Sequence, residues 1–183
     1  MKKLIALLIV ALSLFSCKNK ESKEQTELKP AAKIEVDKTL MRVTFSIVAE
    51  QNDKACLFYT EDGTINFDDK KTVWVDIKGS KSPQDIVFTL PKNVLPDHLR
   101  VDLGRGKNPL QTYFDIKEFS VDYLDKKFEA KGIMVFNYFY PNKDLNIITP
   151  KSTLLTKKDI NQETGVILYP YLPLTDELSK IIK

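Results

Sequence analysis

The side chains with the clearest chemical potential in this chain are one tryptophan, one arginine and one aspartate. Trp74 lies in a run where apolar residues alternate with polar ones, and it falls among the polar positions. Arg100 and Asp102 occupy the outward positions of a later alternating run. An exposed aromatic ring stacks on the apolar face of a pyranose while carboxylate and guanidinium groups bond its hydroxyls. If the two runs share a sheet, these residues and Tyr59 form a candidate ligand-binding group.

A structural interpretation of the same residues stays open. The apolar segment 133–140 or the C-terminal tail can cover Trp74, and Arg100 and Asp102 can form a surface ion pair with each other. The exposure of Trp74 decides between the two interpretations, because a ligand needs the ring to be accessible.

Acidic turn residues offer a second kind of site. Asp62, Asp68 and Asp69 lie close together in the sequence and supply the oxygen ligands that calcium prefers. Their spacing lacks the glycine and glutamate of an EF-hand loop. We therefore interpret them as solvated turn residues and keep them as weaker candidates for a structural calcium.

No segment groups a nucleophile with a base, which argues against an enzyme. Cys56 stands in an apolar run, so we expect a small buried side chain rather than a reactive thiol. His98 is the single histidine, which excludes sites that need two imidazoles. The glycines of 104–109 lack the Gly-Lys-Ser/Thr ending of a phosphate-binding loop. The 28 basic and 25 acidic residues give no excess typical of nucleic-acid binding.

Short alternating runs between residues 34 and 148 predict the elements that hold these side chains. Apolar residues recur at every second position and turn residues separate the runs, which is typical of an antiparallel β-sandwich. We expect strands at 40–47, 56–60, 72–78, 85–90, 98–104, 113–123 and 127–131. The alternation slips between Ile116 and Phe119, which predicts a β-bulge there.

The character of the chain changes in residues 149–183. Residues 153–161 have a weak helical pattern, and two prolines predict extended chain from 169 to 173. Thr175 is the expected N-cap of a short C-terminal helix whose apolar face carries Leu178, Ile181 and Ile182. Because this tail is too apolar for a free end, we expect it to dock on the sandwich or on a partner.

The central region resembles the galactose-binding-like jelly-roll modules of bacterial surface and glycan-handling proteins. The likeness rests on LFYTEDGTINFDDKKTVWVDIKG at 57–79, VFTLPKNVLPDHLRVDLG at 87–104 and IKEFSVDY at 116–123. It implies an all-β jelly roll and, by analogy, a non-catalytic role in binding saccharide or in decorating a larger enzyme.

The first seventeen residues, MKKLIALLIVALSLFSC, resemble a bacterial lipoprotein signal. Two lysines precede an apolar run that is too short to span a bilayer, and the segment ends on Cys17. In that family residues 1–16 are removed and the cysteine receives a diacylglycerol, which implies that Cys17 is lipidated. The mainly polar residues 17–33 then form a tether. Lys18, in place of an aspartate, implies the outer membrane, with the domain facing the periplasm or the cell surface.

These expectations combine into one functional hypothesis and one alternative. A lipid-anchored sandwich without a visible catalytic group suits a non-catalytic binding module at the bacterial cell envelope, with a saccharide or an envelope protein as its ligand. The alternative is a structural or assembly lipoprotein that holds a protein partner through segments 133–140 and 166–182.

Overall fold

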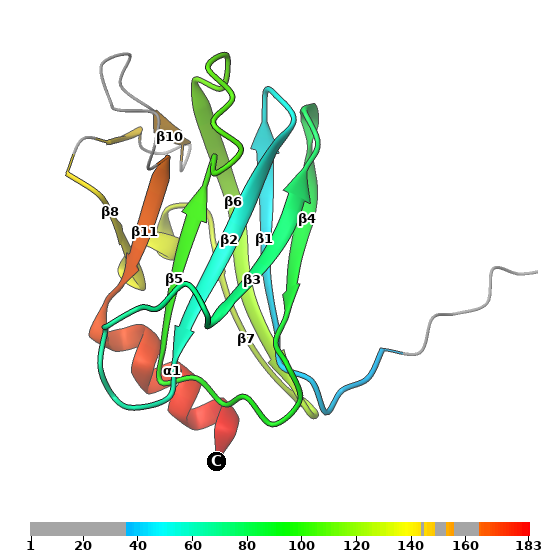
Figure 1. Cartoon of the computed structure of the whole chain (residues 1–183), viewed down its shortest axis with the longest axis vertical. Helices are drawn as coiled ribbons and strands as arrows, with labels where there is room; N and C mark the ends of the chain where they lie inside the picture. The colour runs from blue at the N-terminus through cyan, green and yellow to red at the C-terminus, as the bar shows by residue number, and fades with distance from the viewer. Residues whose placement is uncertain (1–35, 144, 149–152, 156–164) are drawn as a thin grey trace, which may run out of the picture. The chain divides into compact units, whose positions relative to one another are not determined.

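The chain folds as an all-β sandwich with a short C-terminal helix, which confirms the expected fold class (Figure 1). The computed structural model describes residues 36–143, 145–148, 153–155 and 165–183. The expected signal peptide, the lipidated Cys17 and the tether 17–33 lie outside these described residues.

Two antiparallel sheets form the layers of the sandwich. The first sheet has the strand order β4-β1-β6-β10-β9, with β7 also paired to β6, and the second sheet has the order β3-β2-β5-β11-β8. The strands are β1 (Arg42–Ala49), β2 (Asp53–Thr60), β3 (Thr72–Ile77), β4 (Ser80–Thr89), β5 (His98–Leu103), β6 (Tyr113–Tyr123), β7 (Lys126–Lys131), β8 (Phe139–Pro141), β9 (Asn146–Ile148), β10 (Thr153–Leu155) and β11 (Val166–Pro170). A 3₁₀ helix, η1 (Gly132–Asn137), and the helix α1 (Leu172–Ile182) complete the fold.

The core lies between the two sheets because successive side chains of a strand point to opposite faces. In β5, for example, Leu99, Val101 and Leu103 are fully buried in the core. Aromatic rings join the layers: the ring centres of Phe45 and Phe119, from the first sheet, lie 5.6 and 5.0 Å from that of Phe139 in the second. The inward faces of the long strands are thus used for packing, and their outward faces are left for other roles.

The predicted β-bulge is present in β6. Ser46 of β1 pairs with Glu118, whereas the next residue, Ile47, pairs with Ile116, so Lys117 is the extra residue. Without this insertion Ile116 and Phe119 would face opposite sides of the sheet, and with it both are buried. The bulge therefore keeps both halves of the long strand in register with the core.

The C-terminal segment is built into the second sheet and its flank. β11, drawn in orange in Figure 1, pairs with β5 on one side and β8 on the other. The helix begins at Leu172, so the expected N-cap at Thr175 and the expected extended chain up to Pro173 are wrong. Pro173 fits the first helical turn, where a backbone N–H has no intrahelical partner. The buried residues of α1 are Leu174, Leu178 and Ile181, whereas Ile182 is only partly buried.

Two other segments show what the sequence pattern left open. The apolar stretch 133–140 divides between η1 and the short strand β8. Thr153–Leu155, which we expected to be weakly helical, is the strand β10. It pairs with β6 in a register that places Thr153 opposite Asp115. Pairing with an available strand outweighs a weak local helical pattern.

Candidate functional site

Trp74, Arg100 and Asp102 lie on the outer face of the second sheet, as the alternation predicts. Strand β2 lies between β3 and β5, and its Cys56 pairs with Trp74 on one side and with Asp102 on the other. These positions form one row across the sheet, so two strand spacings, about 10 Å, separate the backbones of Trp74 and Asp102. The Trp74 side chain is 50% exposed, and its ring is therefore accessible to a ligand.

Arg100 and Asp102 form an ion pair, but a buried one rather than a surface one. Arg100 Nε and Nη2 donate to Asp102 Oδ1 and Oδ2, each over 2.8 Å. The guanidinium carbon of Arg100 lies 4.0 Å from the ring centre of Phe58, and only 19% of the Arg100 side chain is exposed. Asp102 is fully buried. Its carboxylate therefore cannot contact a ligand, which rules out the expected hydrogen bond from a sugar hydroxyl to Asp102.

The electrostatics of Asp102 follow from this burial. Desolvation raises the pKa of its carboxyl above the ordinary value, while the hydrogen bonds and positive charge of Arg100 oppose that rise. Arg105 contributes more weakly, with its Nη1 atom 4.0 Å from Asp102 Oδ2. The Arg100–Asp102 pair is therefore desolvated and lies below the part of the sheet surface where Trp74 and Arg105 are exposed to solvent.

Tyr59 does not belong to this group, which corrects the sequence-based assignment. It pairs with the inward residue Leu99, is 7% exposed and is part of the core. Its neighbour Phe58 occupies the outer face, because consecutive strand residues point to opposite sides. The sequence-based assignment therefore chose the wrong one of two adjacent aromatic residues: Phe58 lies on the outer face and Tyr59 in the core.

The calcium candidates are turn residues whose oxygens bond the chain itself. Asp62 Oδ1 accepts hydrogen bonds from the backbone N and Oγ1 of Thr64, which lower the pKa of Asp62. Asp68 Oδ1 accepts from a backbone N–H two residues on, and the carbonyl of Asp69 accepts from Thr72 Oγ1. Within the described residues, no group of three or more His, Cys, Asp and Glu side chains is placed to hold a metal ion.

Cys56 and His98 have structural surroundings. Cys56 is fully buried and in no disulfide. Burial, reinforced by the Asp102 carboxylate, raises the pKa of its thiol to about 12, so the thiol stays protonated at neutral pH. The His98 ring contacts the Gly63 carbonyl oxygen through Nε2 (3.3 Å) and the Thr175 hydroxyl through Nδ1 (3.0 Å), which ties the loop after β2 to α1.

A shallow hollow beside Trp74 adds polar groups that sequence reasoning did not select. It is lined by Asn52, Asp53, Lys54, Asp76, Ile77, Lys78 and Gly106. Lys54 Nζ lies 3.8 Å from Asp76 Oδ1, and both side chains are well exposed. The guanidinium carbon of Arg105 lies 5.8 Å from the Trp74 ring centre. Alternation marks Lys54 and Asp76 as outward positions, but only strand pairing shows that they meet beside Trp74.

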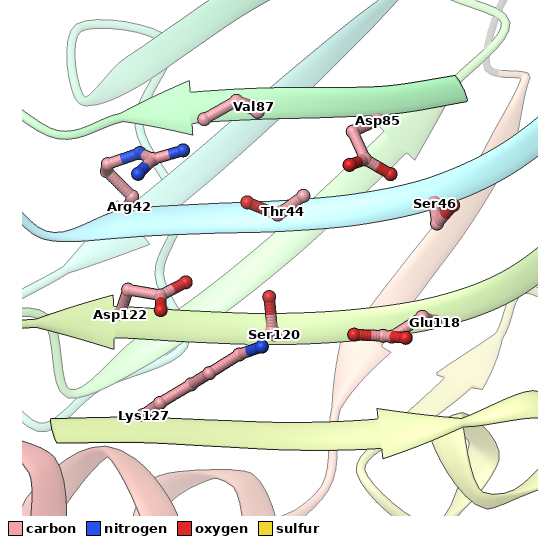
Figure 2. Close-up of a pocket in the computed structure, with 9 residues that line it drawn as sticks. All are labelled: Arg42, Thr44, Ser46, Asp85, Val87, Glu118, Ser120, Asp122 and Lys127. Atoms are coloured by element: carbon pink, nitrogen blue, oxygen red, sulfur yellow. The ribbon is translucent and has the colours of Figure 1, made fainter. Parts of the chain in front are cut away.

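The outer face of the first sheet has a second hollow, which we call the polar basin (Figure 2). It is lined by Arg42, Thr44, Ser46, Asp85, Val87, Glu118, Ser120, Asp122 and Lys127. These residues come from four neighbouring strands, β4, β1, β6 and β7. No motif in the sequence sets them apart, because their alignment depends on the register between strands that are distant in the chain.

Among the described residues, no helix is both long enough and apolar enough to cross a membrane. Comparisons of the chain with protein-family models, curated proteins and solved structures found no match. The functional argument therefore depends on the arrangement of the residues themselves.

Proposed function

We propose that this protein is a membrane-anchored, non-catalytic binding module of the bacterial cell envelope and that its ligand is a carbohydrate. The observation that carries the proposal is Trp74, the only tryptophan of the chain, which stands 50% exposed on the outer face of a sheet. A large aromatic ring presented among polar groups is the surface that the apolar face of a pyranose covers.

The surroundings of Trp74 supply the complementary hydrogen bonds. Asp76 accepts and Lys54 donates on the same sheet face, and Asn52 can do both at the rim of the hollow. The guanidinium of Arg105 lies over the Trp74 ring, with its carbon 5.8 Å from the ring centre. In this proposal Arg100 and Asp102 are positioning residues, because they hold the strand surface beneath the ligand without contacting it.

The anchor in this proposal is the lipid on Cys17, and the location is the outer membrane. It is supported by the resemblance of residues 1–17 to a lipoprotein signal and by Lys18 after the cysteine. Labelling growing cells with radioactive palmitate tests it. The wild-type chain should carry the label in the outer-membrane fraction, and Cys17→Ala should lose it; equal labelling of both would refute the anchor.

Carbohydrate binding is tested by probing a glycan array with the full chain in detergent. Trp74→Ala should lower the binding to any glycan that the wild type recognises at least about tenfold, since a stacking ring is lost. Leu172→Ala is a matched control, because it shortens an exposed apolar side chain at the start of α1. Absence of glycan binding, or binding that is unchanged in Trp74→Ala, would refute this use of Trp74.

The alternative function is that of an assembly lipoprotein that holds a protein partner. A specific observation favours it: Met134, Tyr140, Tyr171 and Leu172 are all exposed, and the ring centres of Tyr140 and Tyr171 lie 4.7 Å apart. Together with Ile133, these are the large apolar side chains that the segments 133–140 and 166–182 leave exposed. An exposed apolar group of this kind is typical of protein interfaces.

Deleting the C-terminal segment would not test this alternative, because β11 is an internal strand of the second sheet. A photo-crosslinking residue at position 172 tests it without removing the strand. The alternative expects one defined adduct in living cells, competed by excess wild-type chain, and none from the same probe at position 74. Equal or absent crosslinking at both positions would exclude it.

A further inference from the structure

Most hydrogen-bonding groups of the polar basin have no partner within the described part of the chain; the exceptions are Lys127 and Glu118, which form ion pairs with Glu129 and Lys131. Six of its side chains take part in no ion pair and no side-chain hydrogen bond there: Arg42, Thr44, Ser46, Asp85, Ser120 and Asp122. Arg100 and Asp102, on the other sheet, satisfy each other. The basin therefore holds free donors and acceptors in a surface hollow.

Strand register arranges these groups as a floor with charged ends. Across β1 and β6, Arg42 pairs with Asp122, Thr44 with Ser120, and Ser46 with Glu118. Figure 2 shows Thr44 and Ser120 in the middle, Arg42 and Asp122 at one end, and Ser46, Asp85 and Glu118 at the other end. Four residues along a strand span about 13 Å, and the three spacings between four strands span about 14 Å. An area of this size accommodates a short oligosaccharide.

Two details indicate that these groups are held ready for a ligand. Arg42 and Asp122 are direct cross-strand neighbours of opposite charge, yet they form no ion pair. Ser120 is 6% exposed, and its hydroxyl, which faces the hollow, has no hydrogen-bond partner among the described residues, so it is available to a ligand.

The chemistry of the lining selects the class of ligand. The basin has two basic and three acidic side chains, a net charge of −1, which disfavours a polyanion. Val87 is its single apolar residue, so an acyl chain or an apolar helix finds no matching surface. Alternating donors, acceptors and hydroxyls match the adjacent hydroxyl groups of a sugar, which both donate and accept.

We propose that the polar basin is a second saccharide-binding site, in which a neutral oligosaccharide lies across β4, β1, β6 and β7. The inference shares the ligand class of the proposed function, but it rests on different residues on the opposite sheet. The principal contacts are hydrogen bonds from Arg42 and to Asp85 and Asp122, with Thr44 and Ser120 beneath the sugar.

The test is isothermal titration of the full chain in detergent with neutral gluco-, galacto-, manno- and xylo-oligosaccharides, with tryptophan fluorescence recorded in parallel. Because Trp74 is the single tryptophan and lies on the other sheet, binding in the basin should leave its emission unchanged. Arg42→Gln and Asp122→Asn should each weaken binding about tenfold or more, the cost of a charge-assisted hydrogen bond. Lys117→Gln, on β6 but outside the lining, is the matched control and should bind as the wild type does.

The outcomes separate the two sites. If Arg42→Gln abolishes the heat of binding and Trp74→Ala preserves it, the result supports the basin and overturns the Trp74 site. Binding that shifts the emission of Trp74 and survives Arg42→Gln and Asp122→Asn overturns the basin and supports the Trp74 site. No heat with any of the neutral sugars, or preferential binding of sulfated dextran, also overturns the basin. Thermal unfolding of each variant verifies that the fold is intact.

Discussion

Replacing Arg100 with Met should destabilise the fold by about 3 kcal/mol at pH 7. The substitution keeps an unbranched stem beside Phe58 but leaves the fully buried Asp102 carboxylate without its two 2.8 Å hydrogen bonds. Removing one partner of a buried ion pair costs roughly 3–5 kcal/mol. The lower end applies here, because Arg105 Nη1, 4.0 Å from Asp102 Oδ2, remains as a partial partner.

The loss should depend on pH in a defined direction. Arg100 opposes the rise that burial causes in the pKa of Asp102, so without Arg100 that pKa rises further. A carboxyl with a raised folded-state pKa contributes stability that is present below its unfolded pKa, near 3.8, and is lost as the pH rises through the folded value. The deficit of Arg100→Met should therefore be small near pH 4 and grow towards pH 7.

Urea unfolding followed by far-UV circular dichroism measures this deficit at each pH. For a domain of this size, about 3 kcal/mol corresponds to a fall in Tm of roughly 6–12 °C. Arg105→Met, which removes only the distant partner, should cost less than about 1 kcal/mol, and Arg100→Met with Asp102→Leu should recover much of the loss. The reasoning fails if Arg100→Met is as stable as the wild type, or if its deficit is the same at pH 4 and pH 7.

Two further predictions concern the thiol and a glycine. Because the pKa of Cys56 is raised to about 12 from about 9, its contribution to stability should be lost between pH 9 and 12; unfolding curves of the wild type should fall more steeply there than those of Cys56→Ala, and parallel curves would contradict this. Gly165→Ala places a Cβ in steric conflict with the Leu103 carbonyl oxygen, whereas Gly63→Ala, also at positive φ, meets nothing within 4 Å. Thermal unfolding should show a loss of about 1 kcal/mol for Gly63→Ala and clearly more for Gly165→Ala; equal losses would argue against the close approach of the strands.

Alternation of residue types was sufficient to predict the strands from β1 to β7, the bulge near Lys117 and the outward direction of Trp74, but not the short strands from β8 to β11. These features depend on local geometry, in which each side chain's face follows from its position in a run. The beginning of α1 was predicted too late, because Pro173 was taken to exclude helix at a position where the first turn accepts it.

The composition of the sites was much harder to predict, because it depends on which strands become neighbours. Lys54 meets Asp76 through the pairing of β2 with β3, and Thr44 meets Ser120 through the pairing of β1 with β6. The burial of Asp102 likewise depends on Arg100 and on the elements packed around it. Alternation of apolar and polar residues along one strand does not reveal these neighbours. Sequence patterns assign a side chain to a face, whereas its neighbours on that face are set by the long-range register.

The position of β11 also has a consequence for biosynthesis. Its pairing joins Val166 to Leu103, so β2, β3 and β5 leave the ribosome well before the strand that completes their sheet. Until residue 170 has been made, β5 presents an unpaired edge, which invites aggregation or cleavage. A product that stops before β11 should therefore aggregate or be cleaved more readily than the full-length chain.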